Sequence, residues 1–293
     1  MIKVPEFKQS NTTPDELLLY LYQSSHYITN ALAKGISMNN LHEPVGVLLN
    51  IGLKFLNISK SIQCLLSVAQ DSISCFCLLR TQADYLSSLY LIFEKSKNNP
   101  NDCKFRYLLY FLDGFQSRHE VLTEHVKLEN NGSITDEEFQ KLKKQVEDAD
   151  KNSLSGIKEC KKLLDEHPYK QINAELFYNI VKDKAWKYKS FDSNIKKPNK
   201  YTWKELYSLL DSRDSISSFF SYLSQYVHGL LNAIIIEDSP ENFYNIKCFE
   251  ISLLSKYQDL LTTLYGKEII NEKIFYPELR RQINKVLASY KQT

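Results

Sequence analysis

The sequence predicts an all-α protein that folds as a single multi-helix bundle over residues 1–293. Three observations favour this class. Glycine and proline are few, with eight of each in 293 residues, whereas sandwiches and barrels need a turn about every ten residues. Apolar residues recur at helical spacing through most long segments. Recognisable helix-start signals precede these segments.

The first four predicted helices have clear beginnings. A capping box with proline at the first helical position opens a helix over 13–34. A second helix is expected over 44–69, and a third over 72–97. An Asn-Pro pair then caps a fourth, over 102–128.

Residues 130–170 are expected to project as a charged helical hairpin or arm. Thr135 and Glu138 have capping-box spacing at its start, and Pro168 follows its end. The apolar residues between them form a narrow stripe, which indicates packing on one side only.

The last third of the chain alternates between irregular and helical patterns. Residues 182–204 are predicted to be a basic, aromatic linker, and a short helix should begin near its end. Three helices should follow, a strongly apolar one over 213–236 and two more over 240–265 and 276–290. No strand is needed anywhere.

Composition and charge narrow the function classes. The net charge of +2 gives no global attraction for nucleic acid or acidic membranes, so an electrostatic partner needs a local patch. No metal-ligand spacing or cofactor motif is present, and we expect neither a metal nor a cofactor. The N-terminal residues lack a signal-peptide pattern, and no uncharged apolar run reaches about 18 residues. We therefore expect a cytoplasmic protein that does not contact a membrane.

Arg80 and Asp84 lie four residues apart within an apolar helix face. Buried charges must be paired or neutralised, so the two side chains should form an ion pair. Such a pair either fixes the packing of neighbouring helices or lines a polar cleft.

Ser224 and His228 form a second candidate, one helical turn apart beside an apolar face. A neutral histidine there could act as a base, a ligand or a hydrogen-bond bridge. The alternative is a half-buried histidine with a structural role.

Arg118 and His125 are the third candidate. Their spacing resembles the loose motif of HEPN ribonucleases, in which an arginine and a histidine of paired helices face the scissile phosphate. Positions seven apart share a helix face. A solvated helix edge is the alternative.

The fourth candidate is the basic, aromatic segment 182–204, which includes Trp186, Lys187 and Trp203. Lysines beside exposed rings are typical of a single-strand binding surface, where rings stack on bases and cations meet phosphates. Alternatively, the segment is a connection that its aromatic residues pin to the bundle.

Three motifs follow one another along residues 45–265: an Arg-x-x-x-acid helix, then an Arg-x-x-x-Tyr helix, then a Ser-x-x-x-His helix. This order resembles an uncharacterised bacterial all-α family, a domain of unknown function. Arg80, Arg106, Ser224 and His228 occupy the matching positions. The family pattern has glutamate where this chain has Asp84.

The resemblance implies a multi-helix bundle. It also suggests that Arg80, Asp84, Arg106 and His228 converge between helices as one polar cluster.

Two hypotheses for the function follow. In the first, the chain is an HEPN-like RNA-acting protein of the defence type. His228 or His125 would serve as acid and base, Arg80 and Arg106 would contact phosphate, and 182–204 would hold RNA. In the second, it is a non-catalytic module. Its cluster would then bind a small anionic ligand or be purely structural, with a protein or a second copy of the chain as partner.

Overall fold

A computed structural model describes residues 13–34, 36, 41–192, 194–210, 214–229 and 238–270. The protein is all-α, as predicted. Over these residues the only pairing of extended backbone is an isolated bridge between Tyr188 and Lys200. The predicted helix over 276–290 lies outside the described residues. The helix predicted over 213–236 ends earlier, at Val227, and residues 230–237 are not described.

The chain divides into two compact units, where the sequence led us to expect one domain. The bundle unit comprises residues 1–97 and 202–293, and the hairpin unit comprises residues 98–201. The hairpin unit is therefore inserted between two halves of the bundle unit. The bundle unit is formed by two segments that are far apart in the sequence, so no single boundary along the chain separates the two units.

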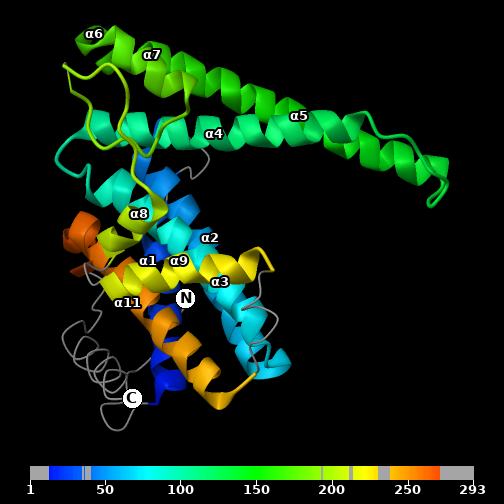
Figure 1. The fold of residues 1–293 in the computed structure, drawn as a ribbon, viewed down its shortest axis with the longest axis vertical. Helices are drawn as coiled ribbons and strands as arrows, with labels where there is room; N and C mark the ends of the chain where they lie inside the picture. The colour runs from blue at the N-terminus through cyan, green and yellow to red at the C-terminus, as the bar shows by residue number, and fades with distance from the viewer. Residues whose placement is uncertain are drawn as a thin grey trace. The chain divides into compact units, whose positions relative to one another are not determined.

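The bundle unit is built from long helices and two short π-helical turns, η1 and η2. These are α1 (Pro14–Leu32), α2 (Pro44–Cys64), η1 (Leu65–Ala69), α3 (Ser72–Leu89), η2 (Tyr90–Glu94), α8 (Trp203–Leu210), α9 (Asp214–Val227) and α11 (Pro240–Ile270). Figure 1 shows α11 beside α1, and α3 packs against α2, α9 and α11.

Capping residues place the helix boundaries in the bundle unit close to those predicted. Thr13 forms the expected capping box with Glu16 at the start of α1. The second predicted helix is α2 continued by η1, and it ends at Gln70, whose φ is 52°. Asp71 then accepts a hydrogen bond from the backbone of Ser74 and begins α3.

α2 and η1 together form the most apolar helical stretch among the described residues. By length and composition alone, Pro44–Ala69 could cross a membrane. A core helix of a globular unit has the same composition, and 56% of its most apolar window is buried inside the structure.

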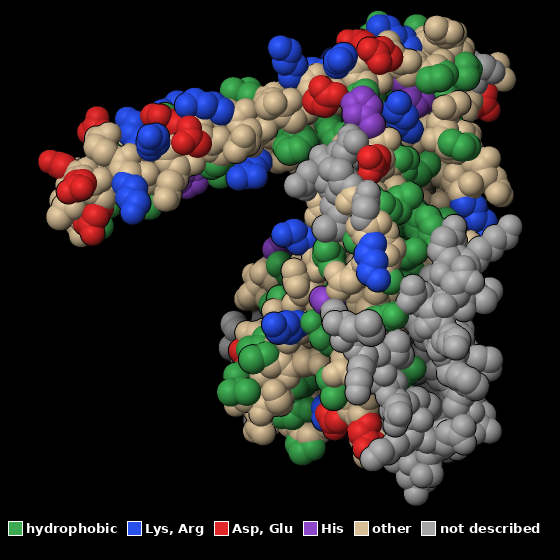
Figure 2. Space-filling model, turned by 180° about the vertical axis from the view of Figure 1, so that it is seen from behind, with side chains coloured by type: hydrophobic (Ala, Val, Ile, Leu, Met, Phe, Trp, Pro, Cys, Tyr) green, Lys and Arg blue, Asp and Glu red, His purple; other side chains and the backbone are tan. Residues whose placement is uncertain are grey.

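The hairpin unit contains α4 (Pro100–Val126), α5 (Asp136–Asp165), α6 (Tyr169–Ile172) and α7 (Ala174–Lys182). α4 and α5 lie antiparallel and side by side (Figure 1). We expected residues 130–170 to form a charged helical hairpin or arm. α5 is one continuous helix within this range, and the helix it pairs with is α4. Figure 2 shows Lys and acidic side chains interspersed along the pair.

Two contacts explain why α4 and α5 approach closely. His119 Nδ1 lies 2.6 Å from Asp150 Oδ1, which joins the second half of α4 to the middle of α5. Close to this contact, Gly156 faces Phe115, and a Cβ atom at Gly156 would stand 2.6 Å from the ring. The narrow apolar stripe of α5 therefore packs against α4, the preceding helix.

Candidate functional site

Arg80 lies on α3 where this helix packs against α9. Its Nε donates a hydrogen bond to Ser224 Oγ at 3.0 Å, and an Nη atom donates to Asp84 Oδ1. The side chain of Arg80 is 12% exposed and that of Asp84 is 31% exposed. The structure thus joins two of the sequence motifs, although they lie 144 residues apart.

α8 supplies two aromatic rings beneath the Arg80 guanidinium. The central guanidinium carbon lies 5.0 Å from the Tyr207 ring centre and 5.5 Å from that of Trp203. The two rings are stacked, with centres 6.0 Å apart. Tyr207 is buried and Trp203 is half-buried. Such cation–π contacts hold a guanidinium most firmly where water is excluded.

Tyr207 also holds the acid of the pair. Its hydroxyl donates to Asp84 Oδ1 at 2.7 Å. Burial, followed by the charge of Asp84, raises the pKa of Tyr207 well above its usual value. The phenol therefore remains a donor across the physiological pH range. We refer to Arg80, Asp84, Trp203, Tyr207 and Ser224 as the Arg80 cluster.

His228 lies beyond the end of α9. Its backbone N–H donates to the Ser224 carbonyl at 3.2 Å, and Gly229 follows with a φ of 60°. This left-handed residue marks the end of the helix. The side chain of His228 is exposed. The Arg80 side chain is directed to Ser224 Oγ and to Asp84 Oδ1. Within the described residues, no hydrogen bond joins the His228 side chain to the Arg80 cluster.

Arg106 lies in the hairpin unit and is 2% exposed. Its Nε donates to Asp102 Oδ2 at 2.8 Å. One Nη donates to the carbonyl oxygens of Tyr188, at 2.6 Å, and Trp186, at 3.3 Å. The guanidinium also lies 3.9 Å from the Tyr188 ring centre. These contacts tie the 186–188 segment to α4, which is a structural role. The convergence of Arg106 with the Arg80 cluster stays a prediction.

The aromatic residues of the 182–204 segment are largely packed inward. Trp186 is 6% exposed and meets the Tyr110 ring edge-on, with centres 5.0 Å apart. Tyr188 is fully buried. The interpretation of these rings as an exposed stacking surface is therefore wrong for Trp186 and Tyr188, because their hydrophobic faces fill the core of the hairpin unit. Lys187 is half-buried, with its ammonium 5.8 Å from the Trp186 ring.

Arg118 and His125 are both exposed on α4. The Nδ1 atom of His125 lies 2.8 Å from the Val121 carbonyl oxygen, as expected for a histidine that bonds its own helix. This arrangement fits the solvated helix edge that we considered as the alternative.

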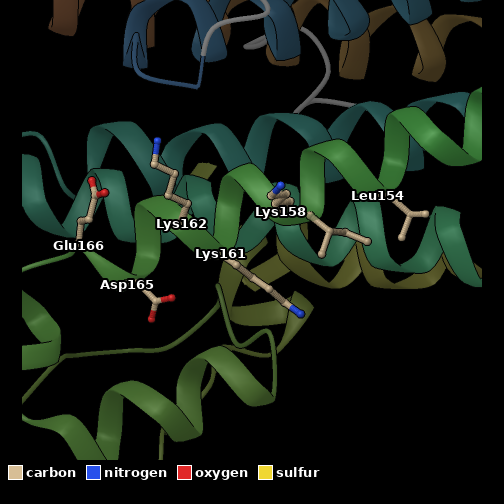
Figure 3. A pocket seen from close by; sticks show the side chains of 7 residues that line it. Leu154, Lys158, Lys161, Lys162, Asp165 and Glu166 are labelled. Atoms are coloured by element: carbon tan, nitrogen blue, oxygen red, sulfur yellow. The ribbon is translucent and has the colours of Figure 1, made fainter.

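A shallow groove on the surface of α5 is lined by two apolar residues, three lysines and two acidic residues. These are Leu154, Ile157, Lys158, Lys161, Lys162, Asp165 and Glu166. Figure 3 shows Lys161 and Lys162 pointing to opposite sides of the helix. Because the ammonium groups diverge and carboxylates lie beside them, the groove does not form a convergent anion site.

Sequence reasoning missed Tyr207 and Asp102. Tyr207 follows Trp203 by four residues, which places both rings on one face of a short helix. Asp102 precedes Arg106 by four residues, the favourable order for an ion pair within a helix. Both spacings were therefore signals in the sequence. Among the described residues, no group of three or more His, Cys, Asp or Glu side chains could hold a metal ion.

The fold and the Arg80 cluster define a class of protein: an all-α bundle with an inserted helical hairpin and an arginine-centred polar cluster between α3, α8 and α9. The chain belongs to the family of unknown function DUF5677, whose model matches residues 46–243. This range contains every residue of the Arg80 cluster. No curated protein and no solved structure matches the chain.

Proposed function

We propose that the protein is a non-catalytic binding module and that the Arg80 cluster binds a nucleotide, either free or as a unit of RNA. One observation carries the proposal. The Arg80 guanidinium is held by Asp84, Ser224 and two stacked rings before any ligand arrives, and the Arg80 side chain is 12% exposed. A phosphate would contact the guanidinium, and the half-buried Trp203 would stack on the base.

Pre-organisation favours binding at this position. A free arginine loses considerable side-chain entropy when a ligand immobilises it, whereas Arg80 is already ordered by Asp84 and Ser224. Asp84 neutralises the guanidinium in the free protein, and an arriving phosphate would share the remaining donor surface. Arginine on an aromatic ring is also suited to nucleotides, because both base and guanidinium are planar.

An HEPN-like ribonuclease is the second hypothesis, and the exposed position of His228 one turn from Ser224 favours it. The binding hypothesis has the stronger support. Asp84 accepts hydrogen bonds from both Arg80 and Tyr207, which makes it a poor base. Within the part of the chain that the structure describes, the His228 side chain also makes no hydrogen bond to the Arg80 cluster.

Calorimetric titration of the full chain tests the proposal with four probes: AMP, adenosine, inorganic phosphate and a single-stranded RNA oligonucleotide. We expect AMP to bind more tightly than adenosine or phosphate. Arg80→Gln should weaken AMP binding about 10–100-fold, because a hydrogen bond to a charged group contributes roughly 1.5–3 kcal/mol. Trp203→Ala should weaken it as well, and Trp203→Phe should largely retain it.

Arg118→Gln is the matched control, since Arg118 is an exposed arginine outside the cluster. RNA binding that exceeds AMP binding and falls steeply with salt would identify RNA as the source of the nucleotide. Equal AMP binding by the wild type and Arg80→Gln, or no binding of AMP and RNA, overturns the proposal. RNA cleavage that His228→Ala abolishes would replace it with the ribonuclease hypothesis.

A further inference from the structure

A buried polar contact in the bundle unit lies apart from the Arg80 cluster. Glu250 on α11 has no exposed surface, and neither has Gln82 on α3. Gln82 Nε2 donates to Glu250 Oε1 at 3.0 Å. Ser59 on α2, which is also fully buried, bonds the same carboxyl group. Three helices therefore meet at one carboxyl group.

The remaining oxygen atoms of this contact lack partners. Glu250 Oε2 and Gln82 Oε1 are both buried and make no hydrogen bond. Both atoms are acceptors if Glu250 is a carboxylate, so neither can satisfy the other. A buried acceptor without a donor is costly, and a buried charge without a partner costs much more.

We infer that Glu250 carries a proton on Oε2 at mildly acidic pH and donates it to Gln82 Oε1. The acid and the amide then form a cyclic pair with two opposed hydrogen bonds. A single proton removes the charge and satisfies both unpaired oxygen atoms. Glu250 is thus a buried proton-binding site that makes the stability of the bundle unit dependent on pH.

The surroundings of Glu250 favour the neutral form. Burial raises the pKa of Glu250 to about 7, against the lowering effect of the bonds from Ser59 and Gln82. Lys247, one turn earlier on α11, is directed to Asp15 of α1 at 2.7 Å. Within the described residues, no Lys or Arg forms an ion pair with Glu250.

One other titratable group from α3 faces this contact. Burial raises the pKa of the Cys75 thiol to about 12, and the charge of Glu250 adds to this effect. The thiol therefore stays protonated throughout the range in which Glu250 titrates. Ser59 and Gln82 themselves do not titrate.

The direction of the pH dependence follows from linkage. The folded pKa of about 7 lies above the ordinary value of 4.5. The protonated carboxyl contributes its full stability below about 4.5, and this contribution is lost as pH rises through 7. Relative to Glu250→Gln, the folding constant of the wild type should fall about tenfold per pH unit within this window, roughly 300-fold in all, and then level off.

Urea unfolding of the full chain from about pH 4.5 to 8 tests the linkage. Glu250→Gln keeps the shape and a donor without the charge, and Glu124→Gln on α4 is the matched control, with a side chain 73% exposed. We expect the wild type and Glu124→Gln to lose stability relative to Glu250→Gln as pH rises. A difference that stays constant, or that shifts in favour of the wild type as pH rises, overturns the inference.

Infrared spectroscopy of the wild type supplies a test that does not depend on the folding of a variant. A protonated carboxylic acid has a carbonyl stretch that a carboxylate lacks. We expect this band near pH 6 in the wild type and in Glu124→Gln, and its loss above about pH 8. Absence of the band near pH 6 overturns the inference.

Discussion

Gly52 on α2 packs directly against Tyr257 on α11, and replacing it by alanine should destabilise the bundle unit. A Cβ atom at this position would stand 2.1 Å from the Tyr257 hydroxyl oxygen and 2.9 Å from the ring carbon that bears it. The ring cannot move without cost, because Tyr257 is fully buried and its hydroxyl bonds Thr29 Oγ1 at 2.9 Å.

Three contributions set the magnitude for Gly52→Ala. Overpacking of a dense core costs about 1–3 kcal/mol. Displacement of Tyr257 breaks its bond to Thr29, which costs about 1 kcal/mol. Alanine in place of glycine in a helix returns about 0.5–1 kcal/mol. We therefore expect a net loss of about 2 kcal/mol in the free energy of unfolding.

Urea unfolding of four proteins measures this coupling: the wild type, Gly52→Ala, Tyr257→Phe and the double variant. Removal of the hydroxyl relieves the closest contact, so the double variant should be more stable than the sum of the single effects predicts, by about 1 kcal/mol. Gly114→Ala on α4 is the control. A Cβ atom there meets nothing within 4 Å, and the substitution should stabilise slightly.

Additive effects of Gly52→Ala and Tyr257→Phe would refute this reasoning. So would a Gly52→Ala protein as stable as the wild type.

Two further predictions concern the hairpin unit. Gly156→Ala should destabilise the α4–α5 pair by about 2 kcal/mol, because its Cβ atom would stand 2.6 Å from the Phe115 ring. We expect faster amide hydrogen exchange along α5 in this variant. An exchange rate equal to that of the wild type would contradict the prediction. Arg106→Met should lower the free energy of unfolding, measured in urea, by about 3 kcal/mol, because it leaves Asp102 without its buried partner. Arg118→Met, at an exposed position, is the control and should change this free energy by less than about 0.5 kcal/mol.

Helix boundaries were predictable because their causes are local. A capping box needs only residues three positions apart, and the boxes at Thr13 and Thr135 both form as expected. The start of α3 depends likewise on Asp71. Even the interruption of α11 at Tyr265, with φ −133° and ψ 30°, lies where the apolar pattern ended.

The ion pair of Arg80 and Asp84 was also predictable, because both residues lie on one helix and their spacing determines whether they can meet. The other partners of this ion pair could not be predicted from the sequence. Ser224 and Tyr207 reach the pair from α9 and α8, and no local rule brings residues 144 and 123 positions distant to one point.

For the aromatic residues after α7, the sequence predicted an exposed binding surface, whereas the structure buries two of the rings. Lysines beside Trp186 and Tyr188 have the composition of an exposed binding surface. Composition does not determine which way a ring points in an irregular segment, because no helical or strand period applies there. The bonds from Arg106 to the carbonyl groups of Trp186 and Tyr188 hold the segment so that both rings are buried.

By itself, the sequence determined the all-α class, the helix starts and the pairing of charges one turn apart, because each depends on interactions within a single helix. Only the tertiary structure decided that the chain forms two units, that α5 pairs with α4, and that Glu250 is buried against Gln82. Those outcomes depend on which apolar faces meet, and many pairings of amphipathic helices satisfy the same pattern until side-chain shape and buried polar groups select one.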